Sequence, residues 1–462
     1  MAVHRVPNVR LRELLLESRW TGAQLARAVN RIGAESGLRG VAYQRASVHQ
    51  WLTGTQPRGP VAHLVCAALT ERLGRTVGLA EAGFDGGGPS DTVRAAGAPP
   101  ASPRSLLTHL AAAALSPDRD GSVLTYQPTV EARSAARATA LPPPGSTLGL
   151  RSHGSGGPDG SDHGGPPAGP HLLALLLPVF SSADQLRGGG HARTALAAFL
   201  SSAVPDMLAA AASPVRHTEV LAAASRLGYL CAFMHFDDEL NGLALHFYRF
   251  ALELARQCGD PAAQAMTLRA MAAQAYELNH PQESLSLARA AAELRLSTTA
   301  TRLRASVLGQ LALAEAATGD RVAAVRHVHE AFDLLPRIEG PAPAVGDYHR
   351  AAWDHHHALV QAELGDLSGA IKSLEASAAR RPRTETRSHA LVLGKLAERQ
   401  LAAGRLDAAC ATWHQFLDVY PLLTSRRAHS AAARLHRRLL PHRRRHPADH
   451  LLQRAASLRL PR

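Results

Sequence analysis

Residues 44–53 read Gln-Arg-Ala-Ser-Val-His-Gln-Trp-Leu-Thr. The Arg and Gln side chains can each form two hydrogen bonds at once, and Val, Trp and Leu supply apolar surface. In a helix, Val48, Trp51 and Leu52 would share one face and leave the opposite face free. Arg and Gln can pair with the edges of guanine and adenine, while hydroxyl groups commonly hold phosphates. The candidate DNA-contacting residues are Gln44, Arg45, Ala46, His49, Gln50 and Thr53. The simpler interpretation is that these are ordinary solvated side chains.

The chain also has 25 histidines, which could supply a metal or catalytic site. The candidates are His355-His356-His357, the pair His327 and His329, and the acidic cluster Asp237-Asp238-Glu239. Adjacent histidines on a helix point in different directions, and no HExxH motif or second carboxylate stands at ligand spacing. An enzyme is therefore the weaker alternative, and we expect no catalytic residues, metal or cofactor.

A third candidate is the segment Arg-Gly-Gly-Gly-His-Ala-Arg at residues 187–193, between two stretches with helical patterns. A glycine-rich stretch before a helix can cradle an anion at the helix N-terminus, and Arg193 would add charge. The segment lacks the Lys-Ser/Thr of a P-loop and the strand of a dinucleotide fold. A hinge is the favoured interpretation.

Four short helices should position the residues 44–53. Leu11, Leu14 and Leu15 mark the first, and Thr21 with Gln24 forms a capping box that opens the second. The third ends at Gly54, and the turn at residues 57–60 leads into a fourth with apolar residues at helical spacing.

This order resembles the λ-repressor-like, xenobiotic-response-element class of bacterial regulators. The class has Leu-Ala in the second helix and a hydrophobic-x-x-Trp-x-x-Gly recognition helix, which fall here on Leu25-Ala26 and on residues 48–54. The sequence departs from the class at residues 33–43, where the connection between the second and third helices is longer than the usual tight turn.

Composition and charge support a helical protein with basic ends. At 462 residues the chain should contain two or three domains. With 46% hydrophobic but only 4% aromatic residues, the cores must be rich in Ala and Leu, which predicts an all-α fold. Residues 1–84 contain eleven Arg against five Glu, and residues 421–462 contain eleven Arg against one Asp, within a net charge of +13. The basic C-terminal tail, residues 441–462, could add a phosphate grip or be a solvated helix face.

The four cysteines are far apart in helical, apolar contexts, so a disulfide framework or metal site is not expected. No signal peptide opens the sequence, and the longest apolar run, residues 172–180, is too short to span a bilayer. We expect a soluble protein of the cytoplasm, associated with the nucleoid and without membrane contact.

Residues 85–170 are rich in Gly, Pro and Ser and bury too little apolar surface to offset their ordering entropy. We expect a disordered, flexible linker between the helix-turn-helix domain, residues 1–84, and the remainder.

Beyond residue 171 the sequence repeats, with small or bulky apolar residues at positions i, i+4 and i+7. The pattern recurs as Ala244/Tyr248/Ala251, Ser284/Ala288/Ala291, Ala324/Val328/Ala331, Ala370/Leu374/Ser377 and Ala409/Trp413/Phe416. In the last three units a glycine precedes it, at Gly319, Gly365 and Gly404, and a proline follows it, at Pro336, Pro382 and Pro421.

Turn glycine, small residues at a helix crossing and terminal proline resemble the tetratricopeptide repeat, although the spacing is longer and HEAT-like pairs remain an alternative. Stacked helix pairs over residues 171–440 would form an α-solenoid whose concave surface holds a peptide or partner helix. The simpler interpretation is a packing or dimerisation module.

Together, residues 8–84 and 171–440 resemble actinobacterial helix-turn-helix transcriptional regulators with C-terminal tetratricopeptide-type repeats. The resemblance implies a regulator that binds double-stranded DNA, possesses repeats that sense a peptide, metabolite or protein, and acts in development or secondary metabolism. A homodimer is consistent with two-fold DNA sites. The alternative is an adaptor that binds proteins through its repeats and does not bind DNA.

Overall fold

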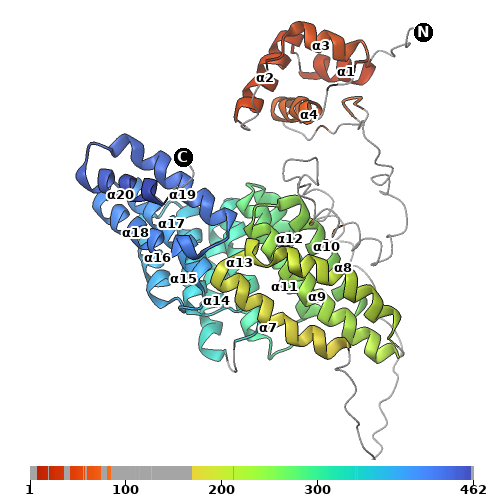
Figure 1. Cartoon of the computed structure of the whole chain (residues 1–462), viewed down its shortest axis with the longest axis vertical. Helices are drawn as coiled ribbons and strands as arrows, with labels where there is room; N and C mark the ends of the chain where they lie inside the picture. Colours follow the sequence, from red (N-terminus) through yellow and green to blue (C-terminus); the bar gives the residue numbers. More distant parts are fainter. Residues whose placement is uncertain are drawn as a thin grey trace, which may run out of the picture. The chain divides into compact units, whose positions relative to one another are not determined.

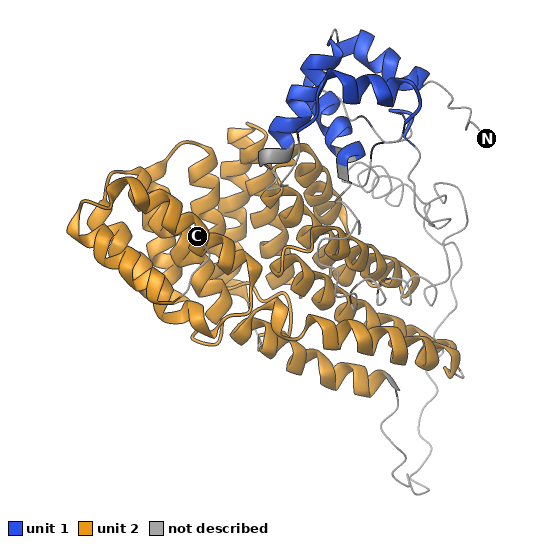
Figure 2. Ribbon diagram, turned by 45° about the horizontal axis from the view of Figure 1, so that its top comes forward, with its two compact units in different colours: residues 1–100, 120–122 blue, residues 101–119, 123–462 orange. Residues whose placement is uncertain are grey.

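The computed structural model describes residues 8–18, 20–35, 42–55, 57, 60–73, 77, 81–84, 110, 114, 126, 169–211, 213–338, 340 and 342–458. All regular elements in these ranges are helices, which confirms the all-α prediction. The chain divides into two compact units, one containing residues 1–100 and the other most of the remainder (Figure 2). We call them the head and the repeat unit and describe each by itself.

The head contains the four short helices that the sequence predicts: α1 (Val9–Ser18), α2 (Gly22–Glu35), α3 (Arg45–Leu52) and α4 (Pro60–Leu73). They share one core that includes Leu11, Leu25, Val48, Trp51 and Leu69. The predicted capping box is present, because the Thr21 amide donates to Gln24 Oε1 at 2.8 Å and the Gln24 amide donates to Thr21 Oγ1 at 3.3 Å.

The repeat unit opens with α7 (Gly169–Arg187) and α8 (Arg193–Ala209), which a 3₁₀ turn at Gly189–His191 separates. Stacked helix hairpins follow it (Figure 1). The hairpins are α9 (Pro214–Asp237) with α10 (Asn241–Gln257), α11 (Pro261–Glu277) with α12 (Pro281–Glu293), α13 (Thr301–Ala317) with α14 (Arg321–Leu334), α15 (Arg350–Glu363) with α16 (Leu367–Arg380), α17 (Thr386–Ala402) with α18 (Leu406–Val419), and α19 (Arg426–Leu439) with α20 (His446–Ser457).

The repeated apolar pattern lies on the second helix of each of the first five hairpins, which are α10, α12, α14, α16 and α18. All fifteen residues of the pattern are buried, from Ala244 to Phe416. Serine hydroxyls add hydrogen bonds between the two helices of a pair, from Ser225 to the Ala251 carbonyl at 2.8 Å and from Ser377 to the Ala351 carbonyl at 2.7 Å. The predicted solenoid of helix pairs is therefore confirmed.

The turns of the first five hairpins share one backbone conformation despite their different residues. Gly319, Gly365 and Gly404 have φ of 90°, 84° and 74°, as their role in ending a helix requires. Glu239 and Asn279 occupy the corresponding turns of the first two pairs with φ of 57° and 63°. The first two pairs thus follow the fold without the glycine that identifies the later ones.

The helix α7 contacts both α9 and α17, elements that lie far apart along the solenoid. Arg387 of α17 donates to Asp184 of α7 at 2.9 Å, and both side chains are buried. The Thr424 amide, before α19, donates to the Arg187 carbonyl at 2.6 Å. An early helix is thereby bound to the C-terminal pairs of the same unit.

The segment at residues 187–193 is a packed junction. This packing differs from both the hinge and the anion-binding loop that the sequence suggested. The Gly189 amide donates to Asp237 at 2.8 Å, so a carboxylate of the chain itself takes the place of an external anion. A methyl group at Gly189 would overlap the Met234 backbone, and one at Gly190 would meet the Thr424 carbonyl at 2.8 Å. The buried Arg193 pairs with Asp238 at 2.7 Å.

Two predicted boundaries can be compared with the structure. The expected disordered linker lies almost wholly outside the described residues, but Leu110 and Ala114 are buried in a core of the repeat unit and Tyr126 packs against that core. A separate basic tail was expected from residue 441. Instead, Leu451 and Ala455 of α20 are buried in one core with α17, α18 and α19, so the packed helices continue to α20. Among the described helices, none combines the length and hydropathy that crossing a bilayer requires.

Candidate functional site

The helix α3 exposes the residues that the sequence selects. Val48 and Trp51 are buried, whereas the six candidate contact residues are all exposed: Gln44, Arg45, Ala46, His49, Gln50 and Thr53. A short helix with a fixed apolar face and a free polar face has the form that enters a DNA groove. Contact between these side chains and DNA remains a prediction.

Several hydrogen bonds hold α3 in place at its two ends. The Gln44 amide donates to Ser47 Oγ at 3.3 Å at the start of the helix. At its end, the Asn8 amide donates to the Leu52 carbonyl at 3.0 Å, and Gly54 follows with φ of 99°. Close packing adds to these, since a methyl group at Gly22 of α2 would lie 3.3 Å from Val48.

Asn30 fixes the end of the long connection between α2 and α3. Its side-chain nitrogen donates to the Tyr43 carbonyl, and the Tyr43 amide donates to its Oδ1, both at 2.8 Å. Tyr43 in turn lies 5.4 Å from the Trp51 ring. Residues 36–41 of the connection lie outside the described residues, but the side chain of α2 that receives its end was not recognised from the sequence.

Basic side chains on the head are partly committed to internal contacts. Arg31 pairs with Glu71 at 2.6 Å, and Arg72 donates to the Ser18 carbonyl at 3.1 Å. Arg12, Arg27 and Arg45 are exposed and form no ion pair with the part of the head that the structure describes. These guanidinium groups are available to phosphates or bases.

The repeat unit contains a cavity of ≈ 210 Å³, for which the sequence predicted a concave surface but no lining residues. Its walls come from the first helices of the pairs, α9, α11, α13, α15, α17 and α19, and from the segments that precede α15 and α17, so it lies on the concave side of the stack. Aromatic residues contribute Phe233, Phe236, Tyr276 and Tyr348, and the cationic residues are Arg269, Arg381, Arg387, Lys395 and Arg427.

The cations of this cavity outnumber its lining carboxylates, Glu277 and Asp347. Glu277 accepts a hydrogen bond from Lys395 at 3.1 Å and forms an ion pair with Arg427 at 3.2 Å. Although burial opposes it, these two cations lower the pKa of Glu277 to about 2. One carboxylate is therefore shared between two positive charges.

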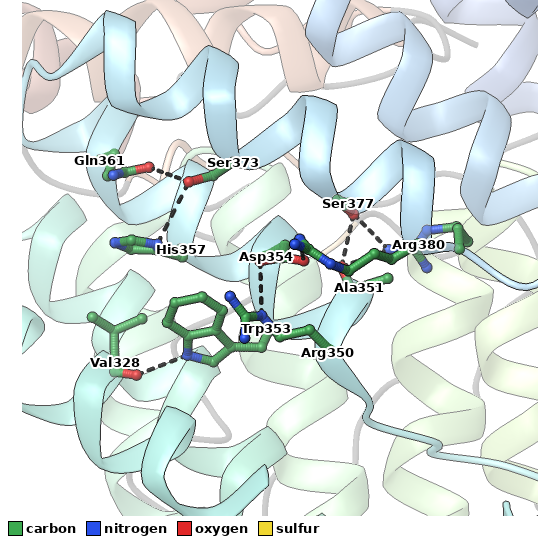
Figure 3. Close-up of polar contacts among 11 residues, drawn as sticks. Val328, Arg350, Ala351, Trp353, Asp354, His357, Gln361, Ser373, Ser377 and Arg380 are labelled. Atoms are coloured by element: carbon green, nitrogen blue, oxygen red, sulfur yellow. Dashed lines mark hydrogen bonds and ion pairs between the residues drawn. The ribbon is translucent and has the colours of Figure 1, made fainter. Parts of the chain in front are cut away.

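His355, His356 and His357 do not form one cluster. This agrees with the expectation that adjacent histidines on a helix point in different directions. His355 and His356 line the cavity, and His356 Nδ1 lies 3.2 Å from the Tyr348 hydroxyl. His357 does not line it and lies 3.5 Å from the Ser373 hydroxyl (Figure 3). Burial lowers the pKa of each of them below its ordinary value.

A different trio, Asp347, His349 and Glu385, brings three possible metal ligands within 4.8 Å of one another. Cations already occupy both carboxylates, since Asp347 pairs with Arg302 at 2.5 Å and Glu385 with Arg381 at 2.6 Å. His349 also contacts Glu385 at 2.7 Å. The trio reads as an ion-pair network that supports the loop before α15.

With this geometry, the chain can be compared with known proteins. Residues 11–85 match the family model of the SP15 N-terminal domain. The match corresponds to the head and includes all four of its helices except the first two residues of α1. No curated protein matches the chain.

Among solved structures, the chain is similar to a Rap protein complexed with competence and sporulation factor. The two share 15% sequence identity with a TM-score of 0.35, over 63% of this chain and 98% of that chain. Because this TM-score is low, we assign the repeat architecture from the helix pairs of the chain and not from this similarity.

Proposed function

We propose that the chain is a transcriptional regulator that binds double-stranded DNA through α3, and that its repeat unit binds a peptide, metabolite or protein partner. The observation that carries the proposal is the two-sided construction of α3. Its apolar side is buried at Val48 and Trp51, while Arg45, His49 and Gln50 are presented to solvent.

Electrostatics support the same assignment. Three guanidinium groups that have no partner among the described residues of the head, those of Arg12, Arg27 and Arg45, give it cations that can neutralise phosphates. Arg45 and Gln50 are also the side-chain types that pair with base edges. A homodimer on a two-fold site, and a cytoplasmic, nucleoid-associated location, belong to this proposal, which assigns no catalytic role.

The direct test is a binding titration of the full-length protein with a duplex that the protein itself has enriched from sheared genomic DNA of its source organism. An Arg45→Ala/His49→Ala/Gln50→Ala variant should lose at least about tenfold in affinity at matched salt, since each good base contact is worth about 1–3 kcal/mol. A matched control replaces exposed residues of the same types in the repeat unit, Arg304, His329 and Gln282, and should bind like the parent.

Equal binding by the parent and the α3 variant would exclude α3 as the contact surface. An absence of binding by both would favour an adaptor that acts only through its repeats.

A further inference from the structure

Arg269 of α11 is a half-buried cation without a counter-charge in the part of the chain that the structure describes. It lines the concave cavity, yet it forms no hydrogen bond or ion pair with any described residue. The other lining cations all have carboxylate partners: Arg381 pairs with Glu385, Arg387 with Asp184, and Lys395 and Arg427 with Glu277. Taking an unpaired charge from water is costly, so a structural role alone does not account for an arginine at this position.

Other hydrogen-bonding groups around the same cavity are also unused. Gln310 Nε2, His355 Nδ1 and Arg381 Nε are buried and make no hydrogen bond with described residues. All three residues line the cavity with Arg269. Buried polar groups usually have partners, and several unpaired ones around one cavity indicate a ligand that would supply them.

The walls beside these groups are fixed rather than adaptable. The Arg387 guanidinium lies 4.7 Å from the Phe233 ring centre, and the Arg427 guanidinium lies 4.6 Å from that of Phe236. Both arginines are also held by ion pairs, Arg387 with Asp184 and Arg427 with Glu277. The cavity is thus preorganised, with aromatic surface next to positive charge.

From these observations we propose that the concave cavity binds a carboxylate-bearing ligand, with the Arg269 guanidinium as its counter-charge and Gln310 and His355 as further hydrogen-bonding groups. The inference deepens the proposed partner-binding role of the repeat unit and rests on it. One uncompensated guanidinium matches one carboxylate, and its planar fork can bind both oxygens. A phosphate dianion would bring more charge than Arg269 alone balances.

The volume limits what else the ligand carries. At ≈ 210 Å³ the cavity is smaller than the roughly 300–1,000 Å³ typical of drug-sized sites. It has room for a carboxylate and a short apolar or aromatic group beside Phe233 and Phe236. The carboxylate could be that of a small organic acid or the terminus of a peptide.

The test measures ligand binding to the full-length protein by calorimetry and by the shift in its thermal unfolding midpoint. The probes are benzoate and succinate, a pool of short peptides with free C-terminal carboxylates, the same pool as C-terminal amides, and inorganic phosphate. Binding of the small acids or of the free-acid peptides supports the proposal and identifies the source of the carboxylate.

Arginine-to-glutamine substitutions inside and outside the cavity test the role of Arg269. Arg269→Gln should weaken binding by about 10- to 100-fold, as expected for loss of a charge-assisted hydrogen bond. Arg289→Gln, at an exposed position of α12, should leave it unchanged. Arg269→Lys keeps the charge without the fork and should bind with intermediate affinity.

The ligand-free unfolding midpoint of Arg269→Gln should equal or exceed that of the parent, because no ion pair is lost. A much lower midpoint would make Arg269 structural and overturn the proposal. Equal binding of acid and amide pools, binding of phosphate but not carboxylates, no binding at all, or undiminished binding by Arg269→Gln would each do the same. Carboxylate binding together with failure of DNA binding would overturn only the DNA-binding part of the proposed function.

Discussion

Individual buried histidines make the repeat unit sensitive to acid. Burial lowers the pKa of His235 to about 4 and that of His356 to about 3. Arg193 acts on His235, and Arg269 and Arg381 act on His356, in the same direction. Between these values and about 6.5 the unfolded chain binds more protons than the folded one, so stability falls as the pH falls. Asp184 opposes the trend, because burial raises its pKa to about 6.

The resulting prediction concerns the urea midpoint of the full-length protein, followed by circular dichroism at pH 7 and pH 5. Each of the two histidines should cost up to about 2 kcal/mol at pH 5, so His356→Gln should reduce the difference between the two midpoints. His329→Gln, at an exposed position, is the control and should leave the difference unchanged. An undiminished difference in the His356 variant would show that this side chain is not buried neutral.

At the residue scale the sequence indicated more of the head than of the cavity. The outward residues of α3 follow from helical spacing around Val48 and Trp51, and the structure exposes all of them. Arg269 carries no such signal, since nothing in its neighbourhood of the sequence shows that Gln310 and His355 lie around the same cavity.

Whole elements were predictable where one local signal repeats. The buried pattern on α10 to α18 recurs often enough to show its period, and Gly319, Gly365 and Gly404 mark the later turns. Glu239 and Asn279 adopt the same conformation without glycine, which explains why the first two pairs are faint in the sequence.

The contact of α7 with α17 was not predictable, because Asp184 and Arg387 are separated by 203 residues. The glycine segment shares this difficulty. A run of three glycines is as compatible with a hinge as with a packed junction. The structure shows why glycine is needed there, because a side chain at Gly189 or Gly190 would meet the backbone of Met234 or Thr424.

The packed-junction assignment predicts a specific effect of Gly189→Ala. The added methyl group meets backbone that cannot rotate away, so we expect a loss of about 2–3 kcal/mol in stability and faster amide exchange near the end of α7 and at residues 423–425. Gly319→Ala is the control, with open space around it and a cost of about 1–2 kcal/mol from its positive φ alone. A Gly189 variant with unchanged stability and exchange would restore the hinge interpretation.

At the scale of the whole molecule, two compact units carry separate candidate sites: α3 in the head, and the concave cavity in the repeat unit. Residues 1–84 contribute a net charge of +6 from eleven Arg and five Glu, which suits association with a polyanion. Charge alone gives binding without sequence preference, so the central claim depends on the side chains of α3 rather than on the basic composition.

The measurement that tests this claim most directly is a selection of genomic DNA fragments by the full-length protein. It would run beside the Arg45→Ala/His49→Ala/Gln50→Ala variant and the Arg304/His329/Gln282 alanine control at matched salt. The account predicts that the parent and the control recover fragments sharing one motif and that the α3 variant does not. Recovery of the same motif by the α3 variant, or of no shared motif by the parent, would contradict it.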